Sequence, residues 1–161
     1  MIFFFFFYLY IVDIRGIIFL MLLQKLCLLY LLIVSFTDLH SGRIPNCISF
    51  GFFVLMIISN IIIDPSELPI RLLCAFSFFL LFLFILLFTR GIGMGDVKLS
   101  FVIGYCTGFL NTSLVFIFAC LAGIFFFFIA YILKKKIKKI PFAPFVTVGY
   151  VMSELLCRRM L

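Results

Sequence analysis

The chain has 161 residues, of which 67% are hydrophobic and only 12% are charged. An ordinary soluble domain is about half apolar and about a quarter charged, and a chain of this length cannot hide so much apolar surface in its own core. The composition therefore excludes a soluble globular domain and predicts an integral membrane protein, most of whose surface lies against the lipid bilayer.

The net charge of +7 could also suggest nucleic-acid binding. Much of this charge, however, lies in one short run between apolar segments, made up of Lys134, Lys135, Lys136, Lys138 and Lys139. Such a run is typical of a cytoplasmic loop that also contacts anionic lipid headgroups. We therefore expect no nucleic-acid partner.

The N-terminal residues 1–20 do not fit a membrane span. They are rich in Phe but interrupted by Asp13 and Arg15, and a charge at the bilayer centre costs at least about 2.5 kcal/mol. The interpretation that we favour is that Met21 is the true start, so that 1–20 is a start-site artefact and the first helix covers about 21–37. The alternative is a genuine extra segment at the membrane interface.

Several further stretches are long and apolar enough to span a bilayer, which takes about 20 residues of helix. They cover residues 48–63, 70–88, 99–116 and 114–133. The last two run together, and the polar cluster Asn111, Thr112 and Ser113 predicts a tight turn between them.

A last span is predicted over 141–157. Pro141 and Pro144 stand at its start, where a missing N–H has no helical partner to lose. The sequence thus predicts an all-α fold, a polytopic membrane bundle of about six transmembrane helices. Residues 21–161 form its single membrane-embedded domain.

Six spans place three connecting segments, 38–47, 89–98 and 134–140, on one side of the bilayer. Most of the basic residues lie in these segments, and the opposite side holds mainly Arg71, Arg158 and Arg159. The positive-inside rule assigns the three segments to the cytoplasm.

Six acidic residues are available for chemistry. Asp64 and Glu67 lie in a short Pro-containing loop on the opposite side and predict a solvated turn, and Glu154 is interpreted as a boundary residue of the last span. Outside the N-terminal extension this leaves Asp38 and Asp96, each at the predicted cytoplasmic end of a span.

Asp96 follows glycines at alternate positions, Gly91, Gly93 and Gly95. Such a run makes a poor helix and lets the backbone approach its neighbours closely. Irregular backbone at membrane depth must face protein or a water-filled cavity, so we expect Asp96 to face a polar site.

Two carboxylates on the same side of the bilayer can share a proton, one acting as a base on water and the other polarising a carbonyl as an acid. The residues alone leave a second interpretation open. Asp96 could cap the fourth span, and Asp38 could offset the charge of Arg43.

Three motifs in order favour the catalytic interpretation. Asp38 is followed by Gly42-Arg43-Ile44-Pro45-Asn46, then comes Gly93-Met94-Gly95-Asp96-Val97-Lys98-Leu99, and then Ile140-Pro141-Phe142-Ala143-Pro144-Phe145. In these motifs, and in their spacing relative to the spans, the chain from about Met21 to Gly149 resembles the type IV prepilin peptidase family of GxGD aspartyl proteases.

The resemblance implies a multi-pass enzyme of the inner (cytoplasmic) membrane with its active site facing the cytoplasm. Such an intramembrane aspartyl endopeptidase cleaves the basic leader from membrane-tethered prepilins or pseudopilins. The catalytic pair matches Asp38 and Asp96, and the family needs no metal or cofactor for peptide hydrolysis.

The resemblance is to the short form of the family. Longer members carry a cytoplasmic region with paired CxxC cysteines and methylate the new N-terminus of the product. None of the six cysteines of this chain forms a CxxC pair, so no methyltransferase activity is expected, and we interpret all six as packing residues.

The remaining motif residues have supporting roles in this interpretation. Gly93 and Gly95 are interpreted as positions where the backbone needs glycine, and they support the placement of Asp96. Pro45 and Asn46 are expected to open the second helix, because proline presets a helical φ.

Lys98 follows Asp96 by two residues, so on a helix it points away from that carboxylate. We interpret it as an anchor to headgroups or to a loop. The single histidine, His40, is expected to be an exposed loop residue, and the Phe-rich stretches, such as 125–128, are expected to face lipid or to pack.

The rival to a peptidase is a non-enzymatic membrane protein, such as a carrier subunit or an assembly factor. In that case Asp38 and Asp96 would bind a proton or a cation, as acids inside membranes often do. The sequence leaves the oligomeric state open.

Overall fold

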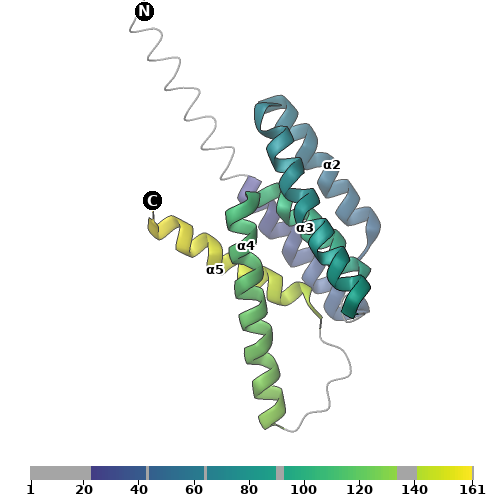
Figure 1. Cartoon of the computed structure of the whole chain (residues 1–161), viewed down its shortest axis with the longest axis vertical. Coiled ribbons are helices and arrows are strands. Elements are labelled where there is room, and N and C mark those ends of the chain that lie inside the picture. The colour runs from purple at the N-terminus through teal and green to yellow at the C-terminus, as the bar shows by residue number, and fades with distance from the viewer. Residues whose placement is uncertain (1–22, 43, 64, 90–92, 134–140, 161) are drawn as a thin grey trace, which may run out of the picture.

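The computed structural model describes residues 23–42, 44–63, 65–89, 93–133 and 141–160, and within these residues it is helical without any strand. The elements are a first helix Leu23–Ser41, α2 Asn46–Ile63, the short turn η1 Pro65–Glu67, α3 Leu68–Thr89, α4 Met94–Ile132 and α5 Ala143–Met160. Figure 1 shows them gathered into one bundle. The predicted all-α class is confirmed.

Three helical segments are long and apolar enough to cross a membrane, namely Leu23–Ser41, Pro65–Thr89 and Met94–Ile132. Two shorter apolar helices, Asn46–Ile62 and Ala143–Cys157, complete the set in the described part of the chain. Helices satisfy their own backbone hydrogen bonds, which lipid cannot do for them. The chain is therefore an all-α membrane bundle, as its composition predicts.

Three of the six predicted spans lie within two or three residues of observed helices. α2 and α3 match 48–63 and 70–88, and α5 begins at Ala143 with Pro144 in its first turn. The predictions for several other positions lie outside the described residues. These are 1–20, Met21, Arg43, Asp64, Gly91 and the lysine-rich loop 134–140.

The first helix is longer than predicted. It runs through Asp38 to Ser41, so the prediction that Asp38 ends it is wrong by about one turn. Gly42 ends the helix with a φ of 60°, and its N–H donates to the Asp38 carbonyl oxygen at 2.8 Å. A left-handed glycine just after the last turn is a common helix stop, and it places the Asp38 side chain on regular helix.

Helix α4 is broken at Gly108, where φ is 75° and ψ is 173°. The predicted turn at Asn111–Ser113 is therefore wrong by three residues. The Thr112 hydroxyl donates to the Gly108 carbonyl at 2.5 Å and the Ser113 hydroxyl to that of Phe109 at 2.9 Å, so these polar residues sit within a helix. The two halves, 94–107 and 109–132, point in different directions (Figure 1).

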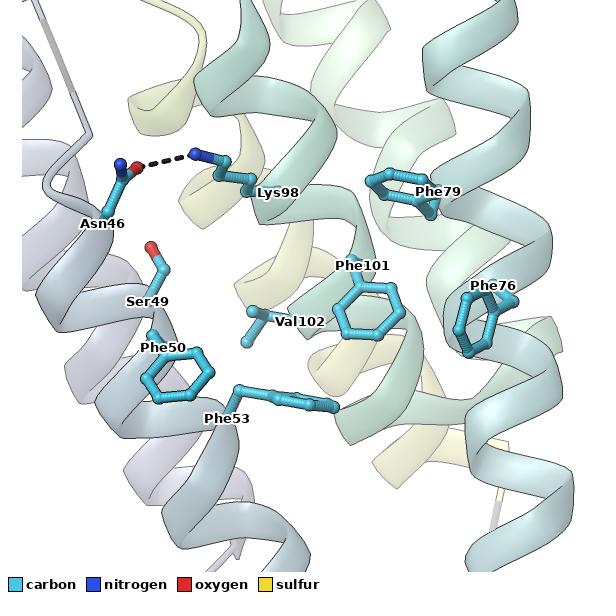
Figure 2. Close-up of a pocket in the computed structure, with 9 residues that line it drawn as sticks. All are labelled: Asn46, Ser49, Phe50, Phe53, Phe76, Phe79, Lys98, Phe101 and Val102. Carbon is cyan, nitrogen blue, oxygen red and sulfur yellow. Dashed lines mark hydrogen bonds between the residues drawn. The ribbon is translucent and has the colours of Figure 1, made fainter.

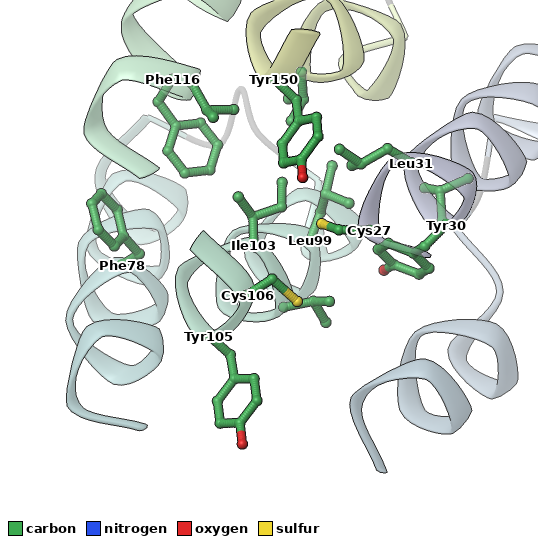
Figure 3. Packing of buried hydrophobic residues seen from close by; sticks show 14 of the residues in the cluster. Cys27, Tyr30, Leu31, Phe78, Leu99, Ile103, Tyr105, Cys106, Phe116 and Tyr150 are labelled. Atoms are coloured by element: carbon green, nitrogen blue, oxygen red, sulfur yellow. The ribbon is translucent and has the colours of Figure 1, made fainter. Parts of the chain in front are cut away.

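The core lies where the first helix, the first half of α4 and α5 meet. Leu31, Leu99, Ile103 and Tyr150 gather there, all at most 1% exposed (Figure 3). Within the described residues no buried side-chain nitrogen or oxygen lacks a hydrogen-bond partner. The buried polar side chains of the described residues thus find their hydrogen-bond partners within the protein.

Two glycines set the closest helix contacts. A Cβ on Gly104 would lie 3.1 Å from the Ala75 Cα, so α4 packs directly on the α3 backbone. A Cβ on Gly149 would clash with the Val115 carbonyl, so α5 packs in the same way on the second half of α4. Small residues that let helix backbones approach are typical of membrane bundles.

The six cysteines differ in exposure, and Cys157 is partly buried. Cys27, Cys74 and Cys106 are buried in the bundle, as predicted. Cys47 and Cys120 are exposed, so the prediction that all six serve as packing residues is wrong for these two. Their exposed surfaces lie on apolar helices, where a thiol is compatible with lipid.

Candidate active site

Asp38 lies in the last turn of the first helix and is partly buried. Its Oδ2 accepts a hydrogen bond of 3.2 Å from the backbone N–H of Ala143, the first residue of α5. The first N–H groups of a helix have no partner within the helix, and they carry partial positive charge. The start of α5 therefore holds the Asp38 carboxylate.

Asp96 lies in the first turn of α4, also partly buried. Its Oδ2 accepts a hydrogen bond of 3.1 Å from the Gly93 N–H, and its own N–H donates to the Gly93 carbonyl at 3.0 Å. This reciprocal pair fixes the side chain against the helix start. Gly93 is the N-cap residue, with extended φ and ψ of −83° and 154°. Asp96 caps the start of α4 from the third helical position, so the capping interpretation of this residue is confirmed, although Asp96 is not the N-cap residue itself.

The glycines before Asp96 differ in what they do. Gly95 belongs to α4, so the expected irregular backbone does not extend to it, and the helix starts at Met94 instead of near residue 99. The expected close approach is confirmed at Gly95, because a Cβ there would lie 3.1 Å from Ile44 Cδ1. The segment that follows the first helix thus packs on the first turn of α4.

These contacts bring Asp38 and Asp96 to the same end of the bundle. The two carboxyl groups are close enough for the charge of Asp38 to act on Asp96. Each receives a backbone N–H from a helix start, one from Ala143 of α5 and the other from Gly93 of α4. The two acids thus lie at helix ends of different helices, near enough for their charges to interact.

Lys98 joins two of the sequence motifs. Its Nζ donates to Asn46 Oδ1 at 2.7 Å, and Asn46 is the first residue of α2, directly after Pro45. The prediction that Pro45 and Asn46 open the second helix is confirmed. Lys98 contacts α2, on the side of α4 that points away from Asp96, as its helical spacing predicts.

The other candidate residues stay outside this site. His40 is exposed, as predicted, but it lies on the first helix and not in a loop, and its ring stacks on that of Phe36, with centroids 6.4 Å apart. Glu67 pairs with Arg71 at 2.6 Å at the η1 end, and Glu154 accepts a hydrogen bond from Tyr150. Among the described residues no group of three or more His, Cys, Asp or Glu side chains could hold a metal.

Sequence reasoning gave no role to two positions that complete the site, Ala143 and Ile44. Ala143 acts through its backbone N–H, and Ile44 through its contact with Gly95. Neither side chain carries chemistry, so residue type gave no signal. Their only signal was that both lie inside the motifs that carry the family resemblance.

The type IV leader peptidase family matches residues 25–128, a range that contains both Asp38 and Asp96. The chain belongs to this family. A curated relative, the prepilin leader peptidase/N-methyltransferase of Bacillus subtilis (strain 168), is 32% identical over 128 residues. The match covers 78% of this chain and 52% of the relative, so the chain spans about half the length of that protein. No solved structure matches.

Proposed function

We propose that the chain is an intramembrane aspartyl endopeptidase that cleaves the basic leader of prepilin-like proteins at the cytoplasmic face of the inner membrane. One observation carries the proposal. Asp38 and Asp96 come from different helices, and each is oriented by a helix-start N–H within electrostatic range of the other. Membership of the leader peptidase family supports the substrate class.

The chemistry follows from two carboxyl groups that share a proton. The ionised carboxylate accepts a proton from a water molecule, whose oxygen attacks the scissile carbonyl carbon. The protonated carboxyl donates a hydrogen bond to the carbonyl oxygen, where negative charge develops. The resulting tetrahedral intermediate breaks at its C–N bond as the leaving nitrogen takes up a proton, so no acyl-enzyme forms.

The described hydrogen bonds suit these roles. Each carboxyl group accepts its backbone N–H through Oδ2, which leaves Oδ1 for water or substrate. Backbone donors on two helix starts hold both groups in fixed orientations, and correct orientation of reacting groups contributes much of an enzymatic rate. The substrate's apolar stem would stay in the bilayer while its basic leader stays in the cytoplasm.

The test is cleavage of a co-expressed prepilin-like reporter with a basic leader, a glycine and an apolar stem, followed by its gel shift. Asp38→Asn and Asp96→Asn keep the side-chain shape and remove the titratable group. Each should lower the cleavage rate by about 10²- to 10⁴-fold. The matched control is Glu67→Gln, at the exposed η1 turn, which should cleave like the unaltered chain.

Membrane levels of all variants should be compared by immunoblot, so that loss of protein is not mistaken for loss of chemistry. Cleavage at the unaltered rate by either Asn variant would overturn the two-aspartate mechanism. If the unaltered chain leaves every prepilin-like reporter uncut, the substrate assignment is wrong.

A further inference from the structure

A cavity of about 550 Å³ lies between α2, α3 and the first half of α4, apart from the carboxylates (Figure 2). Its apolar walls are Phe50 and Phe53 of α2, Phe76 and Phe79 of α3, and Phe101 and Val102 of α4. Lys98 and Asn46 line one end, joined by their hydrogen bond of 2.7 Å. The cavity is therefore an apolar slot with one cationic, hydrogen-bonding end.

The cavity opens on a different side of α4 from the candidate active site. Two residues along a helix turn the side chain by about 200°, so Lys98 and Asp96 point in nearly opposite directions. Asp96 interacts with Asp38 of the first helix, whereas Lys98 contacts Asn46 of α2. A substrate stem that ran from the carboxylates into this cavity would have to cross over α4, which argues against the substrate as its occupant.

The polar end has the chemistry of an anion site. An ammonium group can donate three hydrogen bonds, so the bond from Lys98 to Asn46 leaves donors for another acceptor. When Asn46 accepts through Oδ1, its Nδ2 presents further donors beside the ammonium. Lys98 and Asn46 both lie at helix starts, at the end of the bundle where the spans reach the headgroup region.

We propose that this cavity binds an anionic phospholipid, with its phosphate on Lys98 and Asn46 and one acyl chain between the phenylalanine rings. The phosphate complements the cation, and the acyl chain complements the apolar walls. Such a lipid contacts α2, α3 and α4 together and so holds α2 against the helix that carries Asp96. The proposal stands apart from the peptidase function, because it concerns binding alone.

The first test uses the purified full chain in detergent with equal amounts of phosphatidylglycerol and phosphatidylcholine. Native mass spectrometry then counts the retained lipids. The unaltered chain should prefer phosphatidylglycerol, and Lys98→Gln should reduce this preference about fivefold, the contribution expected of one lysine near anionic lipid. The matched control is Lys25→Gln, an exposed lysine of the first helix, which should keep the preference.

A second test leaves the core unaltered. A photoreactive phenylalanine analogue replaces Phe50, an exposed residue on the cavity wall, and a second chain carries it at Phe125 of α4 as a control. Illumination should give a phosphatidylglycerol adduct at position 50 that falls when Lys98→Gln is added. The lipid adduct at position 125 should not depend on Lys98.

Two results would overturn the proposal. One is an unchanged lipid preference in Lys98→Gln, which would show that Lys98 holds no headgroup. The other is cross-linking of position 50 to the stem of a co-expressed reporter in place of phospholipid, which would assign the cavity to the substrate. Neither readout requires cleavage, so failure here is separate from failure of the proposed peptidase function.

Discussion

The two halves of α4 differ in composition and in surroundings, since 94–107 carries Asp96 and Lys98 and 109–132 carries no charged residue. In 94–107 most residues face neighbouring helices, and Val97, Leu99 and Ile103 are fully buried. The half 109–132 packs on α5 near its start but ends in the exposed phenylalanines 125–128. An apolar side chain of this helix can therefore face either protein or lipid, because lipid is as apolar as the core.

The glycines that α4 itself carries differ between the two halves. In the first half, a Cβ at Gly95 would lie 3.1 Å from the Ile44 side chain, and one at Gly104 would lie 3.1 Å from the α3 backbone. In the second half, a Cβ at Gly123 would have nothing within 4 Å. At both glycines of the first half an added Cβ would thus meet a neighbour more closely than most real Cβ contacts do, and mutations can test this contrast with Gly123.

The largest expected effect is that of Gly95→Val. The added side chain would push Ile44 away from the first turn of α4, which carries Asp96. A displacement of about 1 Å at a catalytic group can lower a rate about 100-fold, and we expect a loss of that size. Cleavage of the prepilin-like reporter, normalised to membrane-inserted protein, is the measurement.

The matched control for this prediction is Gly123→Val, the same substitution in the open half of the same helix. It should change the cleavage rate less than threefold, because a Cβ at Gly123 meets no neighbouring atom within 4 Å. Such a surface substitution changes stability only slightly and leaves the first turn of α4 in place. Equal losses in both variants would show that α4 responds as one unit, contrary to the contrast between its halves.

The next largest effect concerns stability. Gly104→Ala should lower the free energy of unfolding by about 1–3 kcal/mol, since its methyl group would press on the backbone of Cys74 and Ala75. Gly123→Ala should raise it by about 0.5–1 kcal/mol through helix propensity alone. Thermal unfolding of both variants in the same detergent gives the comparison, and effects of the same sign would contradict it.

The smallest effect compares two phenylalanines of the second half. Phe116 is 8% exposed and lies with its ring centroid 4.6 Å from that of Phe82, whereas Phe127 is 58% exposed. Phe116→Leu should destabilise the protein by about 1 kcal/mol through lost packing. Phe127→Leu should stay within about 0.5 kcal/mol. A larger loss for Phe127→Leu in the same thermal assay would mean that a partner covers this end of α4.

Much of the fold could be predicted from the sequence, because apolar stretches of sufficient length must form helices in lipid. The break in α4 could not be placed correctly from polarity. The hydroxyls of Thr112 and Ser113 donate to carbonyls of the preceding turn and so remain within a helix. The φ of 75° at Gly108, which glycine adopts without strain, marks the break.

For the candidate site, the sequence predicted the two carboxylates and the side of α4 on which Lys98 lies. It could not predict that Lys98 binds Asn46, or that α5 supplies a donor to Asp38. Both contacts join segments far apart in the chain, and spacing along one helix carries no information about them. Whether the two acids perform catalysis stays a prediction for the Asn variants.

The bond from Ala143 to Asp38 limits which residues position 143 can hold. The donor is a main-chain N–H, which every amino acid except proline possesses, while the side chain of Ala143 is fully buried. Position 143 therefore requires a small residue other than proline. Exchange of Ala143 for another small residue would leave the same backbone hydrogen-bond donor in place for Asp38.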